Sequence, residues 1–381
     1  MSPSIEILVE LSRQKAIAEE WDAAVPASFA AILSQSAWYY AWQDAFPQKR
    51  SAIVTAREDG RLVGVLPLAQ IRTDARGLYF SQVTTFTGAD YQAPVVASTA
   101  SASVLPTMLD AAVEHFGKRF VYWWANLPTS DPSSMTLSSH LRSRGMRMVE
   151  EYRVAPRLNI AGRAYTEVEA AWAPSHRTDV RRQKKRLAAI GAVSLWEPAT
   201  PAEARAALQE FFTVHDEKWL SQGQPGRFQD VRQRAHFSAI VHRLWGRGLH
   251  FSIVRCGDVN VSFGLGFFSD GWIQWYRPTY RRDYQNLSPG KVHIALLVEE
   301  ACRRGWRGID FLQGAEAYKL QWSNDEIRTV DYYGTFRPWS LQYRWFTQGK
   351  PYVRDRIGPL YARTRMRIQK VAKMTPFTHA G

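Results

Sequence analysis

YRRDYQNLSPGKVHIALLVEEACRRGWRGIDFLQGAEAYKLQW, from Tyr280 to Trp322, is the stretch that decides the fold of this chain. Ser288-Pro289 predicts the start of a helix, because serine caps helix N-termini and proline is favoured at the first helical position. A strand, a polar loop, a helix and a second strand in this order form an α/β unit. The expected elements are a strand ending at residue 280, a helix over 289–304, a strand over 308–312 and a helix near 315–322.

The start of the predicted helix is a candidate phosphate site. Free backbone N–H groups and the positive end of the helix dipole meet there, so a pyrophosphate group would be stabilised. Asn286, Ser288, Gly290 and Lys291 stand where contacts to such a group would be made. The alternative is an ordinary helix cap followed by a solvated lysine.

Hairpin-connected strands are predicted on both sides of the chain's midpoint. Asp59-Gly60, Gly257-Asp258 and Asp270-Gly271 separate β-rich runs, and these dipeptides tolerate the positive φ of tight turns. Strands and helices then follow in the same order in both halves. The expected fold class is α/β with mixed sheets, as two similar tandem units. The predicted boundaries are 1–160 and 166–339, followed by a basic segment over 340–381.

Composition and charge limit the class of protein. Of the 381 residues, 45% are hydrophobic and 22% charged, which is typical of a globular protein with a substantial core. The two cysteines, Cys256 and Cys302, form no CxxC pair, which argues against disulfide scaffolds and structural metal sites. A formal net charge of +14 favours polyanionic partners such as nucleotide phosphates, tRNA, anionic lipid and acidic glycans. We expect no DNA recognition, because no groove-reading motif accompanies the charge.

The N-terminus predicts a cytoplasmic protein. Acidic residues and Lys15 stand where a signal peptide needs its apolar centre. The sequence also has no apolar run of about 18 residues, the length that a membrane span needs.

Two segments concentrate the positive charge. A basic helix is predicted from Ser175 to Ile190, and Arg177 and Arg181 lie four residues apart on one face of it. Two guanidinium groups there could clamp a phosphate of a nucleotide- or lipid-linked sugar, the alternative being a solvated basic face. Residues 340–381 carry nine Lys or Arg against one Asp, with apolar residues at helical spacing. This tail predicts peripheral docking on an anionic membrane, unless it only adds solubility.

Four motifs together resemble those of a known family. They are Arg177 with Arg181-Arg182 in SHRTDVRRQKKRL, His215 and Trp219 in VHDEKWLSQGQPGRF, Ser288-Pro289-Gly290, and DFLQGAEAYKLQW from Asp310 to Trp322. Residues 166–335 resemble the GNAT-type acyltransferases of the BioF2-like or CelD/BcsL group, which are relatives of the FemAB peptidyltransferases. The resemblance implies two GNAT folds side by side, acetyl-CoA or another acyl-CoA as donor, and an acceptor that is often a sugar of an exported polysaccharide.

The donor loop departs from the family pattern. Ordinary GNAT enzymes bind pyrophosphate through an Arg/Gln-x-x-Gly-x-Gly/Ala loop, and residues 286–291 keep only part of it. FemAB relatives take an aminoacyl group from tRNA, which leaves that donor as the alternative. The chain is also similar to holdfast-polysaccharide acyltransferases, in which a C-terminal region is implicated in sensing cyclic di-GMP. The segment 340–381 is therefore a candidate site for that nucleotide.

Acyl transfer from a thioester needs a base for the acceptor and donors for the developing oxyanion. Lys319 aligns with a lysine that FemAB relatives keep, and its charge could stabilise the tetrahedral intermediate; the alternative is an ion pair with Glu316. Glu316 and Asp310 are candidate bases, although capping or ion pairing is the ordinary role of Asp310. His215 is a further candidate base and Tyr318 a candidate proton donor to the thiolate, with packing as the alternative for both.

Aromatic side chains supply candidate contacts to a sugar. Trp275 and Tyr276, near the end of a predicted central strand, are expected to contact the acceptor, together with Trp219. Packing in the core is the alternative for these rings. We expect an acyl-CoA-dependent N- or O-acyltransferase, without a metal, that modifies a sugar of an exopolysaccharide or cell-envelope glycan. A non-catalytic protein that binds cyclic di-GMP or a membrane is the alternative outside enzymes.

Overall fold

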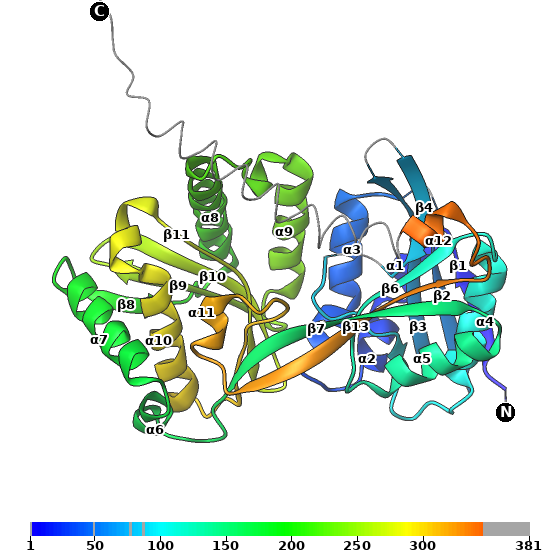
Figure 1. The fold of residues 1–381 in the computed structure, drawn as a ribbon, viewed down its shortest axis with the longest axis horizontal. Coiled ribbons are helices and arrows are strands. Elements are labelled where there is room, and N and C mark those ends of the chain that lie inside the picture. Colours follow the sequence, from blue (N-terminus) through cyan, green and yellow to red (C-terminus); the bar gives the residue numbers. More distant parts are fainter. Residues whose placement is uncertain (1, 49, 76–77, 86–87, 346–381) are drawn as a thin grey trace, which may run out of the picture.

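The computed structural model describes residues 2–48, 50–75, 78–85 and 88–345 (Figure 1). Within these residues thirteen strands form one mixed sheet with helices packed against it, which confirms the predicted α/β class. The strand order is β1-β2-β3-β4-β6-β13-β7-β12-β11-β10-β9-β8, and β5 pairs with β3. Most of the predicted basic segment, with its lipid and cyclic di-GMP predictions, lies outside the described residues.

The N-terminal half contains the predicted hairpin. Asp59 and Gly60 adopt φ angles of +49° and +78° between β2 and β3, as a two-residue turn of this kind requires. The elements of this half are β1 (Ser4–Leu8), α1 (Leu11–Ala16), α2 (Ala18–Ala24), η1 (Ala31–Ser34), α3 (Ser36–Ala45), β2 (Ser51–Glu58), β3 (Arg61–Ala75), β4 (Leu78–Thr84), β5 (Val95–Val96), α4 (Val104–Phe116), β6 (Val121–Pro128), α5 (Pro132–Ser143) and β7 (Arg147–Asn159).

The C-terminal half contains the strand, helix, strand and helix predicted from the opening stretch, with the last two elements shorter than expected. Its elements are α6 (Tyr165–Ala170), α7 (Pro174–Ala188), β8 (Val193–Trp196), α8 (Pro201–Ser221), η2 (Arg227–Gln229), α9 (Val231–Leu244), β9 (Leu249–Cys256), β10 (Val259–Ser269), β11 (Trp272–Tyr280), η3 (Arg282–Leu287), α10 (Pro289–Arg303), β12 (Gly308–Asp310), α11 (Ala317–Leu320), β13 (Asp325–Thr335) and α12 (Leu341–Arg344).

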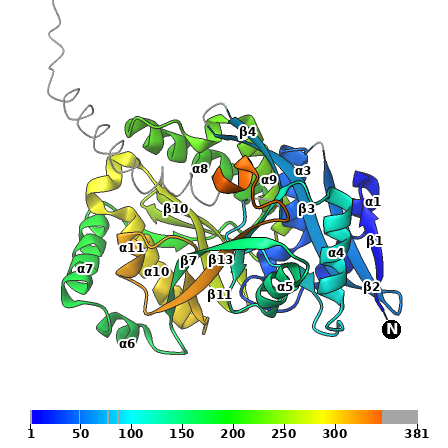
Figure 2. The same ribbon diagram turned by 45° about the vertical axis from the view of Figure 1, so that its right-hand side comes forward.

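Strand β13 joins the two halves of the chain. By sequence it belongs to the second predicted unit, yet it lies between β6 and β7 of the first and runs antiparallel to both. The far end of β7 pairs in turn with β12. Figure 2 shows β7 and β13 running together from one half to the other. The boundary predicted at 160–166 stays a prediction, and the sheet is continuous across it.

A hydrophobic core also spans the halves. Trp38 of α3 is fully buried, and its ring centroid lies 5.1 Å from that of Phe267 and 5.5 Å from that of Tyr276. Phe267 and Tyr276 belong to β10 and β11, so an N-terminal helix packs on the C-terminal strands. Burial of large aromatic surfaces is strongly favourable in water. Separation of the two halves would therefore expose a substantial apolar surface.

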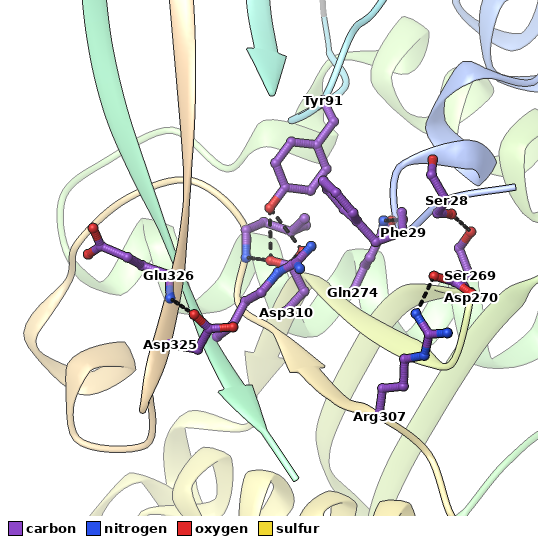
Figure 3. A network of polar contacts seen from close by, with 12 residues as sticks. Ser28, Phe29, Tyr91, Ser269, Asp270, Gln274, Arg307, Asp310, Asp325 and Glu326 are labelled. Carbon is purple, nitrogen blue, oxygen red and sulfur yellow. Dashed lines mark hydrogen bonds and ion pairs between the residues drawn. The ribbon is translucent and has the colours of Figure 1, made fainter. Parts of the chain in front are cut away.

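One carboxylate is the centre of the junction between the halves (Figure 3). Asp310, at the end of β12, has no exposed surface. Arg157 of β7 donates two hydrogen bonds to its Oδ2, from Nε at 3.0 Å and from Nη2 at 2.7 Å. The Tyr91 hydroxyl lies 3.0 and 2.9 Å from the two carboxylate oxygens. The Leu312 backbone N–H donates to Oδ1 at 2.9 Å. These donors give both oxygens of the buried Asp310 carboxylate a hydrogen-bond partner in place of water.

The arginine of this pair is covered by aromatic rings. The Arg157 guanidinium carbon lies 4.0 Å from the ring centroid of Phe29 and 4.4 Å from that of Trp272. Gln274 Nε2 donates to the Phe29 carbonyl at 2.6 Å, which attaches the N-terminal loop to β11. The buried ion pair therefore connects β7, β12, β11 and two N-terminal loops.

Replacing Asp310 by Asn is expected to lower the free energy of unfolding by about 3–5 kcal/mol, because it leaves the Arg157 charge buried without a counter-charge. Urea denaturation at neutral pH measures this loss. The matched control is Glu326→Gln, which breaks the exposed pair with Arg328 and is expected to cost about 0–1 kcal/mol. A loss below about 1 kcal/mol for Asp310→Asn would contradict the assigned role of the pair.

Candidate functional site

Strands β11 and β12 separate at the candidate site. They are parallel and pair over three positions, from Trp272 with Gly308 to Gln274 with Asp310. Among the described residues, no part of β11 beyond Gln274 pairs with β12. Backbone groups on that edge of β11 thus have no partner on β12, and an unpaired strand edge is the feature to which extended ligands with amide groups bind.

A bulge in β11 places Tyr276 and Arg277 side by side. The register between β10 and β11 shifts between Leu265 and Phe267, so that Leu265 faces Arg277 and Phe267 faces Gln274. Paired residues share a face, and Leu265 packs in the core formed with α8 and α9. The Arg277 guanidinium carbon lies 4.4 Å from the ring centroid of Tyr276. Bulges often redirect side chains in this way next to functional sites.

The loop after β12 is strained and firmly held. Leu312 has a φ of +60°, a left-handed conformation that is an outlier for a bulky residue. The Asp310 carboxylate accepts its N–H, and Lys319 Nζ lies 3.4 Å from its carbonyl oxygen and 2.7 Å from that of Gln313. Strain of this kind persists only where the surroundings impose it, and it concentrates at functional sites.

The predicted catalytic residues Glu316, Tyr318 and Lys319 lie together at α11. Lys319 is buried, and its Nζ is 2.9 Å from Glu316 Oε2, so the ion pair considered as the alternative to catalysis is present. Together with the two carbonyls, this pair uses all three ammonium protons. Tyr318 is 40% exposed, and burial raises the pKa of its hydroxyl. Direct roles of these three residues in catalysis stay predictions.

Asp90 is a candidate site residue that sequence reasoning missed. It lies in the loop between β4 and β5, and its carbonyl accepts a hydrogen bond from Gln313 Nε2 at 3.1 Å. Burial raises the pKa of the Asp90 carboxyl, while the nearby Arg277 and Lys319 cations oppose this effect. A carboxyl group with a raised pKa is suited to proton transfer near neutral pH. No local sequence signal connects Asp90 with α11, because the two meet only through the fold.

The predicted donor site lies at the start of α10, which packs on the face of the sheet opposite to α8 and α9. Ser288 is the N-cap residue of α10 and Pro289 follows it at the helix start, as predicted, but Ser288 has a left-handed φ of +48° and its side chain caps no N–H group. A Cβ at Gly290 would meet only the Tyr280 ring, at 3.6 Å, which leaves the backbone there accessible. Asn286 is exposed. Its carbonyl accepts a hydrogen bond from Arg186.

Lys291 borders a pocket of about 430 Å³ between α7, the start of α10 and residues 320–324. Its ammonium group pairs with Asp179, and this interaction lowers the pKa of Asp179 to about 2. The pocket wall includes His176, which is buried against the rings of Trp172 and Trp322. A phosphate at this position has to compete with Asp179 for Lys291.

The predicted phosphate clamp on α7 is engaged in structural contacts. Arg181 donates two hydrogen bonds to Glu169, at 2.9 and 2.6 Å. Arg177 donates to the Ala170 carbonyl at 3.1 Å. Both arginines thus attach α7 to α6, and phosphate binding by them stays a prediction that requires these contacts to break.

His215 and Trp219 lie together on α8. Trp219 Nε1 donates to His215 Nε2 at 3.1 Å, and the histidine ring packs on Phe211 and Phe228. Burial lowers the pKa of His215 to about 4. A general base works best with a pKa near the working pH, and the pKa of His215 is too low for this at neutral pH. Its Nε2 is also already bonded to Trp219, so the packing alternative agrees better with the geometry.

Trp275 and Tyr276 are 3% and 5% exposed. Trp275 packs against His293, with ring centroids 4.8 Å apart, and the Tyr276 hydroxyl donates to the Gly88 carbonyl at 2.6 Å. Both rings therefore belong to the core in this structure. Their contact with an acceptor sugar stays a prediction.

The described residues hold no group of three or more His, Cys, Asp or Glu side chains placed to bind a metal ion. Cys256 and Cys302 are both free thiols. No helix in the described part of the chain has the length and apolarity that a membrane crossing requires.

Comparison with known proteins identifies part of the chain. Residues 174–320 match the family described as an acetyltransferase (GNAT) domain. No curated protein matches the chain by sequence. FemX has a similar structure, with a TM-score of 0.56 and 13% identity, over 81% of this chain and 95% of FemX.

Two further solved structures are similar over most of this chain. The C-terminal domain of a lysylphosphatidylglycerol synthetase from Agrobacterium fabrum has a TM-score of 0.52 at 11% identity, over 84% of this chain and 92% of that one. A conserved protein of unknown function from Bacteroides thetaiotaomicron has a TM-score of 0.54 at 12% identity, over 86% and 99%. At these identities the likeness concerns the fold.

The match of residues 174–320 supports the class of protein: the chain is an acyltransferase. Over 81% of the chain, its fold is similar to that of FemX.

Acid is expected to destabilise the protein as the pH falls below about 6.5, because buried histidines cannot take up the protons that they bind in the unfolded chain. Burial lowers the pKa from 6.5 to about 4 for His215, His236 and His250, and to about 3 for His293. Above the unfolded value both states are neutral and this stability is fully present. The expected loss by about pH 5 is on the order of 1–2 kcal/mol for each such histidine.

Urea denaturation of His236→Phe at about pH 7.5 and at about pH 5 tests this expectation. The phenyl ring suits the site, since His236 packs against Trp38, Phe46 and Phe237. The variant should lose less stability on acidification than the natural chain, whereas His242→Phe, at an exposed position on α9, should lose as much. An identical loss in all three proteins would show that His236 does not contribute.

Proposed function

We propose that this acyltransferase moves an acyl group from acyl-CoA to an amine or hydroxyl of a sugar in an exopolysaccharide or cell-envelope glycan. The observation that carries the proposal is the position of Asp90: its carbonyl accepts a hydrogen bond from Gln313, in the loop that Lys319 holds, and burial raises the pKa of its carboxyl against the opposing charges of Arg277 and Lys319. Acyl transfer needs this combination of a proton acceptor and positive charge.

Different parts of the sheet bind the two ends of the donor. The start of α10 and the adjoining pocket hold the phosphate end of the donor, with Lys291 released from Asp179. The free edge of β11 receives the amide groups of the extended donor arm and directs the thioester toward α11.

The chemical step takes place beside Asp90. Its carboxylate removes the proton from the acceptor nitrogen or oxygen as that atom bonds to the thioester carbonyl carbon. Arg277 and Lys319 stabilise the negative charge that develops on the carbonyl oxygen. The carbon–sulfur bond then breaks, the acyl group stays on the acceptor, and Tyr318 is placed to protonate the departing thiolate.

The similarity of the whole fold to FemX, together with the net charge of +14, favours aminoacyl-tRNA as the second candidate donor. A measurement of donor binding distinguishes the two candidate donors, acyl-CoA and aminoacyl-tRNA. Calorimetric titration of the full chain with acetyl-CoA is expected to give saturable one-to-one binding that weakens in Lys291→Ala. The control Lys185→Ala, at an exposed position on α7, is expected to bind as the natural chain does. Absence of acetyl-CoA binding would contradict acyl-CoA as the donor and favour aminoacyl-tRNA in its place.

Asp90→Asn is expected to lower kcat by about 100-fold or more, because the amide cannot accept the proton. The release of free thiol from acetyl-CoA in the presence of an amino sugar measures this rate. For the natural chain, kcat/KM should fall as the pH drops through the raised pKa of Asp90. The variant should not show this acidic decrease in kcat/KM.

Asp258→Asn, at an exposed turn, is the matched control and should keep full activity. Equal rates for Asp90→Asn and the natural chain would remove Asp90 from the mechanism.

A further inference from the structure

One buried carboxylate outside the proposed chemistry belongs to Asp331 of β13, which has no exposed surface. Its Oδ2 accepts hydrogen bonds from Trp123 Nε1 and from Arg153 Nη2, both at 3.1 Å. Its Oδ1 accepts a hydrogen bond from the backbone N–H of Asn126, at 2.7 Å. Both oxygens are therefore held by donors, and one of these donors is a backbone group of β6.

Strand β6 contains a bulge at this contact. The register between β6 and β13 shifts there, so that Ala125 and Asn126 together oppose the single residue Asp331. Asn126 has a left-handed φ of +55°. Its Oδ1 is buried and has no hydrogen-bond partner in the described part of the chain. Both features oppose folding, and unfavourable local conformations of this kind concentrate at functional sites.

Asn126 holds both ends of the loop that contains Asp90. Its Nδ2 donates a hydrogen bond to the Ala89 carbonyl at 2.8 Å, and its own carbonyl accepts one from the Gln92 N–H at 3.0 Å. Gln92 Nε2 also donates to the Ala89 carbonyl, at 3.0 Å. The residues on either side of the loop are thus bonded to one asparagine, and that asparagine is bonded to Asp331.

The middle of the loop is held from the same strand. Gln313 Nε2 donates to the Asp90 carbonyl at 3.1 Å and to Thr329 Oγ1 at 2.9 Å. Thr329 is fully buried and stands two residues before Asp331 on β13, so the two side chains share a face of that strand. Strand β13 therefore supplies two anchors for the loop, one through Asn126 and one through Gln313.

We propose that Asp331 and Asn126 are positioning residues for Asp90, the base of the proposed function, on which this inference rests. Asp331 holds the N–H of Asn126 and so fixes its left-handed conformation. Asn126 in turn fixes the backbone on both sides of Asp90. The burial of the Asp90 carboxyl is thereby set from β13, the strand that joins the two halves of the chain.

Charged groups on four elements act on the Asp90 carboxyl. They are Arg277 of β11, Lys319 of α11, Arg227 of η2 and Asp310 of β12. Burial is the largest effect and raises the pKa of this carboxyl, while the three cations oppose that effect. A loop released from its anchors admits water to the carboxyl, so the effect of burial decreases and the pKa falls.

Asn126→Gly tests the inference, because glycine adopts the left-handed φ without strain and only the side chain bonded to Ala89 is removed. Hydrogen exchange and the pH dependence of kcat/KM, with acetyl-CoA and an amino sugar, are measured on the full chain. We expect exchange in residues 89–92 to be about tenfold faster and kcat about tenfold lower. The acidic decrease in kcat/KM should move to lower pH, which a side chain that only stabilises the fold would not cause.

Asp331→Asn is the second variant. It keeps the shape of the side chain but not the charge that holds the Asn126 N–H, and it should move both measurements in the same direction. Asp270→Gly is the matched control, since Asp270 also has a left-handed φ, of +50°, and pairs with Arg307 at the surface. The control should keep the natural exchange rate in residues 89–92 and the natural pH profile.

Natural exchange rates in residues 89–92 of Asn126→Gly would overturn the inference. Faster exchange with an unchanged pH profile would also overturn it, because the loop would then be held for stability alone. In both cases a low kcat of Asp90→Asn would still support the proposed function. Full activity of Asp90→Asn would instead refute the proposed function, and with it the base that this inference positions.

Discussion

The buried ion pair between Arg157 and Asp310 is the interaction on which the rest of the structure depends. Two opposite charges without water are stable only if every lone pair and donor finds a partner, and here Tyr91 and the Leu312 N–H complete the set. The partners come from both halves of the chain. Satisfying one carboxylate therefore sets the relative positions of β7, β12 and the loop that carries Tyr91.

The position of the candidate base follows from the same constraint. Because the Tyr91 hydroxyl is bonded to Asp310, the preceding residue Asp90 is brought next to the loop that Lys319 holds. The strained φ of Leu312 is maintained by Asp310 on one side and Lys319 on the other. Stability at the junction and chemistry at the site thus share a single network, and a change at Asp310 would disturb both.

Several residues with the chemical character of a catalyst or ligand contact are engaged in structural contacts in this fold. His215 is buried with a lowered pKa, and Trp275 and Tyr276 belong to the core. Arg181 pairs with Glu169. In each case the residue type agrees with catalysis or binding, yet its surroundings determine whether the group is accessible and ionised. Arg277, by contrast, has no sequence motif to mark it, and a bulge in β11 places it beside the Tyr276 ring.

The sequence by itself determined the features that depend on a few neighbouring residues. The Asp59-Gly60 turn and the helix that begins at Pro289 formed as predicted, and the pair of Lys319 with Glu316 formed as the stated alternative, because their interactions close within about four residues. Only the tertiary structure decided that β13 returns to the first half and that Asp90 lies beside the loop held by Lys319. Those contacts join segments far apart in the chain, and they form only when the shared core and the buried ion pair are complete.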